Sequence, residues 1–135
     1  MADNYLEKQM EDYRSGKFQT RRPSARDSRL IGLLRGQTFL FVEADGYEEL
    51  MGALTEAGCK VAFLSTDRKL GPQIAQTTGS QFHPCTKICI NAIEKSISLI
   101  QSRWGHLDNL ISSGHLPLVE ALKQTYPGLR IIGIH

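Results

Sequence analysis

One turn of this sequence combines a single glycine with four carboxylates, at the place where an expected strand (residues 37–43) meets an expected helix (residues 46–57). A glycine-rich turn at such a place lets backbone N–H groups and the positive end of the helix hold a pyrophosphate. The glycine is Gly46, and the acidic residues are Glu43, Asp45, Glu48 and Glu49. These side chains repel an anion and can themselves satisfy the helix end. The strand–turn–helix unit therefore favours a nucleotide site, while its residues argue against the usual ligand.

Cysteine and histidine are the other residue types here that can bind a metal or act as nucleophiles. The three cysteines are Cys59, Cys85 and Cys89. Their odd number and unpaired spacing predict reduced cytosolic thiols. His115 and His135 each follow a later expected strand, and with Asp45 or Glu43 they could approach a divalent metal. Only adjacency in the expected sheet supports that arrangement, so we expect no metal site.

Length and composition indicate one soluble globular domain. A chain of 135 residues with 41% hydrophobic and 22% charged residues can bury one core but not two. No apolar run approaches the ~20 residues that a membrane span needs. The acidic start, with Asp3 and Glu7, does not resemble a signal peptide. We therefore expect a cytoplasmic protein that does not bind membranes.

Charge is distributed unevenly along the chain, although the formal net charge is only +2. Residues 1–13 carry one lysine and four acidic residues, whereas residues 14–35 carry seven lysines and arginines and one aspartate. A basic stretch can contact nucleic acid, but this one has only Phe18 as an aromatic residue and no recognisable binding motif. We expect a solvated linker, or an arm on an acidic neighbouring subunit, rather than a nucleic acid site.

The N-terminal segment has the pattern of a short helix followed by a linker. Residues 4–7 have the form of a helix N-cap with an acidic residue at the third helical position. Three apolar residues then fall on one helical face, namely Leu6, Met10 and Tyr13. Because so short a helix is marginal alone, it needs a partner surface. The chain thus divides into an N-terminal helix and basic linker, residues 1–28, and an α/β domain, residues 29–135.

From residue 29 onward, strand and helix patterns alternate. The expected strands are 37–43, 60–65, 80–85, 107–112 and 129–134, and the expected helices are 46–57, 69–77, 88–103 and 116–125. The third helix has the clearest apolar stripe, formed by Ile93, Ile97, Ile100 and Trp104. Helical crossovers between consecutive strands predict a doubly wound, parallel five-stranded sheet in Rossmann-like order 3-2-1-4-5, with the N-terminal helix as an appendage.

Three segments carry the pattern of a known family. They are residues 57–64 (Ala-Gly-Cys-Lys-Val-Ala-Phe-Leu), residues 76–85 and residues 102–111 (Ser-Arg-Trp-Gly-His-Leu-Asp-Asn-Leu-Ile). With them, residues 35–115 resemble the first half of a short-chain dehydrogenase/reductase. The resemblance rests on spacing and framework residues more than on functional ones. It implies a cofactor crevice at the carboxyl ends of the first and fourth strands.

At the family's functional positions this sequence has other residues. The glycine-rich turn falls on residues 43–47 and keeps only Gly46. The acid at the end of the second strand falls on Ser65, and the acid that holds the adenine after the third strand falls on Thr86. The Asn-Asn-Ala-Gly motif falls on residues 112–115. The candidate crevice therefore consists of Asp45, Gly46, Tyr47, Ser65, Thr66, Thr86, Ser112, Ser113 and Gly114.

The resemblance also implies where catalytic residues would be. The family's Ser and Tyr-x-x-x-Lys pair would follow the fifth strand, where the sequence ends, and Tyr126 precedes Pro-Gly-Leu-Arg. Hydride transfer needs a positioned cofactor and a general acid. We therefore expect no catalytic residues and disfavour NAD(P) as a cofactor. The hypothesis is a degenerate, non-catalytic relative with a weak or altered ligand crevice or an assembly role. The enzyme alternative is an NAD(P)-dependent oxidoreductase completed by a partner chain.

A second, weaker resemblance is to response-regulator receiver domains. Residues 41–45 (Phe-Val-Glu-Ala-Asp) are similar to the acidic opening of that family, and residues 111–117 are similar to its phosphoacceptor strand. The phosphoacceptor Asp would fall on Ser113, which cannot form the usual acyl phosphate. This resemblance leaves open a receiver-like signalling domain without its phosphoacceptor.

Two apolar surfaces suggest assembly. The fifth strand, residues 129–134, is an apolar edge with unpaired backbone groups, and the N-terminal helix carries an apolar stripe on a basic tether. Burying both in one contact predicts a homodimer, or a heteromer with a longer relative. The alternative is a monomer in which the N-terminal helix covers its own sheet edge.

Overall fold

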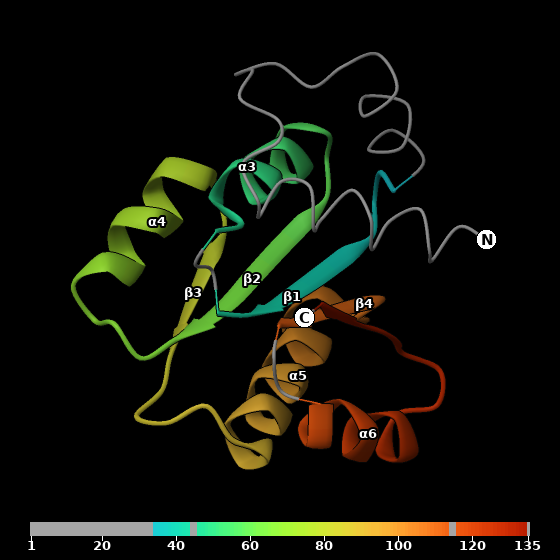
Figure 1. The fold of residues 1–135 in the computed structure, drawn as a ribbon. Helices are drawn as coiled ribbons and strands as arrows, with labels where there is room; N and C mark the ends of the chain where they lie inside the picture. The colour runs from blue at the N-terminus through green and yellow to red at the C-terminus, as the bar shows by residue number, and fades with distance from the viewer. Residues whose placement is uncertain (1–33, 44–45, 114–115, 135) are drawn as a thin grey trace.

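The computed structural model describes residues 34–43, 46–113 and 116–134. In this part of the chain, strands and helices alternate from first to last (Figure 1). The strands are β1 (Thr38–Val42), β2 (Lys60–Ser65), β3 (Gln81–Pro84), β4 (Asn109–Ser113) and β5 (Arg130–Ile134). The helices are α3 (Glu48–Glu56), α4 (Leu70–Thr78), α5 (Ile90–Trp104) and α6 (Leu116–Thr125). The boundaries agree with the sequence-based expectation to within two residues.

The strands form one parallel sheet in the order β3-β2-β1-β4-β5, which confirms the predicted Rossmann-like topology. Receiver domains have the order 2-1-3-4-5 instead. The receiver-like alternative was therefore wrong, because the third strand here lies at the outer edge, beside β2. In this sheet the order reverses between β1 and β4, which places the switch point at those two strands.

Each face of the sheet has its own core and its own pair of helices. Phe39, Phe41 and Phe63 point to the face covered by α3 and α4, whereas Leu40 and Val42 point to the face covered by α5 and α6. Figure 1 shows these two layers on opposite sides of the sheet. Both faces are covered, so all five residues of β1 are buried, and its sequence is a nearly continuous apolar run rather than an alternating one.

The longest described helix, α5, is amphipathic in the way its sequence predicts. Ile93, Ile97 and Ile100 recur at helical spacing and are almost fully buried against the sheet. The helix stops at Gly105, whose φ of 87° is the left-handed conformation common after a helix. Trp104 is half-buried, with the Lys60 ammonium 5.9 Å from its ring centre. This packing fixes α5 along the length of the sheet.

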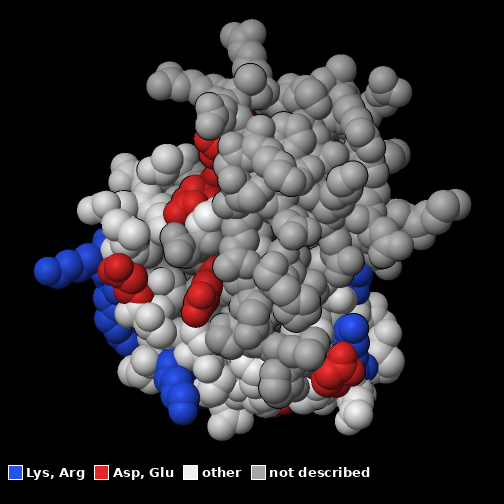
Figure 2. All heavy atoms as spheres, in the orientation of Figure 1, with Lys and Arg blue, Asp and Glu red and all other residues white. Residues whose placement is uncertain are grey.

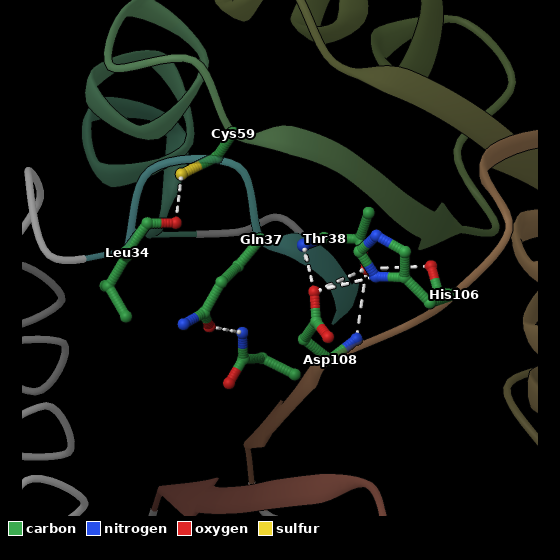
Figure 3. Close-up of polar contacts among 7 residues, drawn as sticks. Leu34, Gln37, Thr38, Cys59, His106 and Asp108 are labelled. Carbon is green, nitrogen blue, oxygen red and sulfur yellow. Dashed lines mark hydrogen bonds and ion pairs between the residues drawn. The ribbon is translucent and has the colours of Figure 1, made fainter.

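A polar clamp joins the amino ends of β1 and β4 (Figure 3). The buried Thr38 hydroxyl donates to the His106 carbonyl oxygen at 2.9 Å and accepts from the Asp108 N–H at 3.0 Å. The Asp108 carboxylate accepts from the Thr38 N–H at 2.9 Å and lies 2.9 Å from His106 Nδ1. The clamp gives hydrogen-bond partners to backbone groups at the start of β1 and just before β4.

The expected N-terminal helix and basic linker lie outside the described residues, so the division at residue 28 stays a prediction. Among the helices that the structure does describe, none combines the length and the hydropathy needed to cross a membrane.

Candidate functional site at the carboxyl edge of the sheet

The candidate crevice lies where β1 and β4 end side by side. Val42, the last residue of β1, is paired with Ser112 of β4, and β2 flanks β1 on its other side. In open α/β sheets, ligands bind at this carboxyl edge where the strand order reverses. The structure therefore brings the turn after β1 and the end of β4 together, as the sequence predicted. Asp45, Gly114, His115 and His135 lie outside the described residues.

The turn after β1 has an unusual backbone. Glu43 has a φ of 76°, and it is the only non-glycine residue in the described chain with a positive φ. Its N–H donates to the Leu64 carbonyl oxygen at 3.1 Å, which holds it against β2. A left-handed conformation costs a residue other than glycine roughly 1–2 kcal/mol. Position 43 thus keeps the backbone shape of a glycine turn without the glycine, which no sequence pattern indicated.

The start of α3 has a buried aromatic N-cap residue and an acidic first turn. Tyr47, the N-cap residue, is 1% exposed, and its ring centre is 5.5 Å from that of Phe41. Glu48 and Glu49 occupy the first turn of the helix, where carboxylates complement the positive helix end. Gly46, also in the predicted crevice, is exposed with a φ of 85°. A pyrophosphate at this helix end would meet two like charges.

The turn after β2 is stabilised by its own hydrogen bonds. The half-buried Ser65 hydroxyl accepts from the Asp67 N–H at 3.1 Å. The Asp67 carboxylate accepts from the N–H groups of Leu70 at 2.8 Å and Lys69 at 3.0 Å, and these bonds lower the pKa of that carboxyl. Asp67 therefore caps the start of α4, and Thr66 beside it is exposed. The Ser65 carbonyl oxygen also accepts from the Cys85 N–H at 3.2 Å, which joins this turn to the end of β3.

Ser112 is the buried polar residue of the crevice. It is 2% exposed, and its hydroxyl has no hydrogen-bond partner among the described residues. Ser113 is the last residue of β4. In the described chain, no three histidine, cysteine or acidic residues come close enough together to hold a metal ion.

Thr86 lies outside the crevice, in a groove beside the edge strand β3. The groove has a volume of about 610 Å³ and runs between β3 and α5. Four of its lining side chains are cationic, namely Arg68, Lys87, Lys95 and Arg103. Sequence reasoning missed this group, because its members come from three segments. The spacing of Lys95, Leu99 and Arg103 on one helical face was the available signal.

His83 forms part of the groove wall and is buried. Its Nδ1 hydrogen-bonds the Ser96 hydroxyl, and its Nε2 lies 3.2 Å from the Gln81 side-chain oxygen. Burial, reinforced by Arg103, lowers the pKa of His83 below its ordinary value. The neighbouring Cys85 has its pKa raised by burial and by Cys89. A protonated thiol is a poor nucleophile, so the groove is better suited to binding than to covalent chemistry.

The clamp of Thr38, His106 and Asp108 contains the residue types of a catalytic triad but not its geometry. Both the Thr38 hydroxyl and the Asp108 carboxylate approach the same ring nitrogen, His106 Nδ1, at 3.4 and 2.9 Å. A triad needs the nucleophile and the acid on opposite nitrogens. The clamp also lies at the amino edge of the sheet, opposite the crevice. Its role is structural.

Comparison with solved structures agrees with this fold. One similar structure is the crystal structure of a short-chain type dehydrogenase/reductase from Mycobacterium marinum, with a TM-score of 0.53 and 15% sequence identity. The match covers 64% of this chain and 38% of that chain. At this identity the likeness shows a shared Rossmann-like fold, over well under half the length of that protein. No protein-family model matches the sequence, and no curated protein does.

Proposed function

We propose that this chain is a non-catalytic Rossmann-like domain of the short-chain dehydrogenase type, with an altered ligand crevice that does not bind NAD(P) tightly. The observation that carries the proposal is the start of α3. There Tyr47 is buried as the N-cap residue, and Glu48 and Glu49 form the first helical turn. A dinucleotide would have to place its pyrophosphate at this end of the helix.

The charges alone oppose tight binding. Two like unit charges about 5 Å apart repel by roughly 1 kcal/mol in water and by roughly 3 kcal/mol at the effective dielectric constant of a protein surface. Two such pairs together cost roughly 2 to 6 kcal/mol, which is on the order of 30-fold to 10,000-fold in affinity. In addition, Ser65 is engaged by Asp67, and Thr86 belongs to the groove rather than to the crevice. The two positions at which the family holds the adenosine half of the cofactor therefore carry other groups in this chain.

Calorimetric titration with NAD⁺, NADH, NADP⁺ and NADPH tests the proposal. We expect dissociation constants above about 1 mM, equivalent to less than about 4 kcal/mol of binding free energy. The double variant Glu48→Gln/Glu49→Gln should bind more tightly than the wild type, whereas Glu56→Gln, at the other end of α3, should not. Sub-millimolar binding by the wild type would favour the rival function instead, an NAD(P)-dependent oxidoreductase completed by a partner chain.

A role in assembly fits the edges of the sheet. In the described chain β5 is an edge strand, and an unprotected edge can pair with another chain. We propose a homodimer or a heteromer with a longer relative, in the cytoplasm, where the three free thiols stay reduced. Light scattering on the full chain and on a chain starting at Ser28 tests this. A monomer in both cases would refute the assembly role, and dissociation of the shorter chain alone would assign the contact to the N-terminal arm.

A further inference from the structure

The groove between β3 and α5 has a strongly one-sided charge. Its lining includes Arg68 from the turn before α4, Lys87 from the loop before α5, and Lys95 and Arg103 from α5 itself. None of the lining residues is acidic, and within the described chain none of the four cations forms an ion pair. Figure 2 shows lysine and arginine side chains along the lower left margin of the face in view, on the side where α4 lies in Figure 1.

The start of α5 strengthens the positive potential at one end of this groove. Cys89, the N-cap residue, makes no side-chain capping bond, and no acidic residue occupies the first turn. The N-cap residue of α3 likewise makes no side-chain capping bond, but two glutamates complement that helix end, whereas α5 has none. Glu43 contributes to the raised pKa of Cys85, and Glu94 lines a neighbouring hollow with Lys95 and Leu99, but neither carboxylate lines the groove itself. The lining of the groove therefore supplies four cations and no carboxylate to balance them, which favours the binding of an anion.

The groove also has an apolar wall. Leu99 is 45% exposed there, one of the largest exposures of a hydrophobic side chain in the described structure, and Phe82 and Pro84 line the same space. A volume of about 610 Å³ lies within the range of small-molecule sites. We propose that this groove binds a small organic dianion, in which a phosphate monoester or dicarboxylate head group is attached to an apolar body.

A small molecule suits this groove better than an added peptide strand. β3 is an edge strand of only four residues, and its last residue, Pro84, has no N–H to offer to a pairing strand. The groove is also separate from the crevice at β1 and β4. Binding here therefore does not depend on whether the crevice accepts a dinucleotide.

Titration of the full chain with phenyl phosphate and with phthalate, followed by NMR chemical-shift mapping and calorimetry, tests the proposal. Inorganic phosphate supplies the charge alone, and benzyl alcohol supplies the apolar body alone. We expect at least one of the two aromatic dianions to bind at least tenfold more tightly than either fragment, with shifts centred on residues 85–103. The comparison between phenyl phosphate and phthalate distinguishes the two head groups.

Variants locate the binding in the groove. Lys95→Gln/Arg103→Gln removes two exposed cations and should weaken binding at least tenfold, whereas Lys123→Gln on α6, outside the groove, should leave it unchanged. Leu99→Ser should weaken phenyl phosphate binding and not inorganic phosphate binding. Unchanged thermal midpoints exclude unfolding as the cause. Equal affinity for aromatic dianions and inorganic phosphate, no effect of the double variant, or shifts elsewhere would overturn the proposal.

Discussion

Replacing Thr38 by valine tests how much the clamp at the amino ends of β1 and β4 stabilises the fold. Valine has nearly the same shape as threonine, so the change removes a hydroxyl without leaving a cavity. That hydroxyl donates to the His106 carbonyl oxygen at 2.9 Å and accepts from the Asp108 N–H at 3.0 Å, at a residue only 1% exposed. Both of these hydrogen bonds are lost, and the His106 carbonyl oxygen loses the hydroxyl as its donor, whereas the Asp108 N–H keeps a second, longer bond to backbone.

The expected loss of unfolding free energy is about 2 kcal/mol. Each of the two hydrogen bonds contributes about 1 kcal/mol net, and an unsatisfied buried group costs more. Two features limit the loss: the Asp108 N–H also lies 3.3 Å from the Thr38 carbonyl oxygen, and valine has a higher strand preference. With a urea dependence of about 2 kcal/mol per molar, the unfolding midpoint should fall by about 1 M.

Urea unfolding followed by the fluorescence of Trp104, the single tryptophan, measures this change. Thr38→Ser is the matched control, because it keeps the hydroxyl and should lose less than about 1 kcal/mol. The slope of the transition must be the same in all three proteins for the comparison to hold. If valine and serine at this position give equal stabilities, the hydroxyl does not hold the clamp and the reasoning fails.

Three further predictions concern the core and the groove. Because burial lowers the pKa of His83 below its usual 6.5, the unfolded chain binds a proton more readily; stability should be complete above about pH 6.5 and decline as the pH falls toward the folded-state pKa. The difference in urea midpoint between pH 7.5 and 5.5 should shrink in His83→Gln, and an unchanged difference would contradict the assignment. Gly71→Ala should lose about 1–2 kcal/mol, since a Cβ there would lie 2.5 Å from the Phe82 ring, while Gly52→Ala, with open space around it, should gain up to about 1 kcal/mol; equal effects in thermal unfolding would refute the packing argument. Ile97→Ala, at a buried position on α5, should cost about 3 kcal/mol in urea unfolding, and a loss below about 1 kcal/mol would mean that α5 repacks.

The fold could be predicted because its signals are local and repeated. Apolar runs such as residues 38–42 and the isoleucine spacing of α5 each identify one element, and strict alternation of strand and helix then leaves few topologies. The candidate site was only partly predictable. That the turn after β1 meets the end of β4 follows from topology, and the pairing of Val42 with Ser112 confirms it.

What the sequence did not indicate depends on three-dimensional detail. No local sequence pattern links Arg68, Lys87 and Lys95. Only the arrangement of β2, β3 and α5 in space brings them around one groove. Tyr47 was expected to line the crevice, yet its ring turns into the core against Phe41. Side-chain direction at a helix N-cap is decided by packing, which spacing alone does not encode.

The left-handed backbone at Glu43 has a consequence for how this crevice could change over time or by design. Function-gaining substitutions in a binding site usually sacrifice stability, because productive residues are rarely the best-packed ones. Position 43 is different, since the backbone already has the conformation in which glycine is unstrained. Glu43→Gly would relieve backbone strain and remove a negative charge in the same step. For this one position, the relief of local strain and the removal of a charge that repels anions point in the same direction.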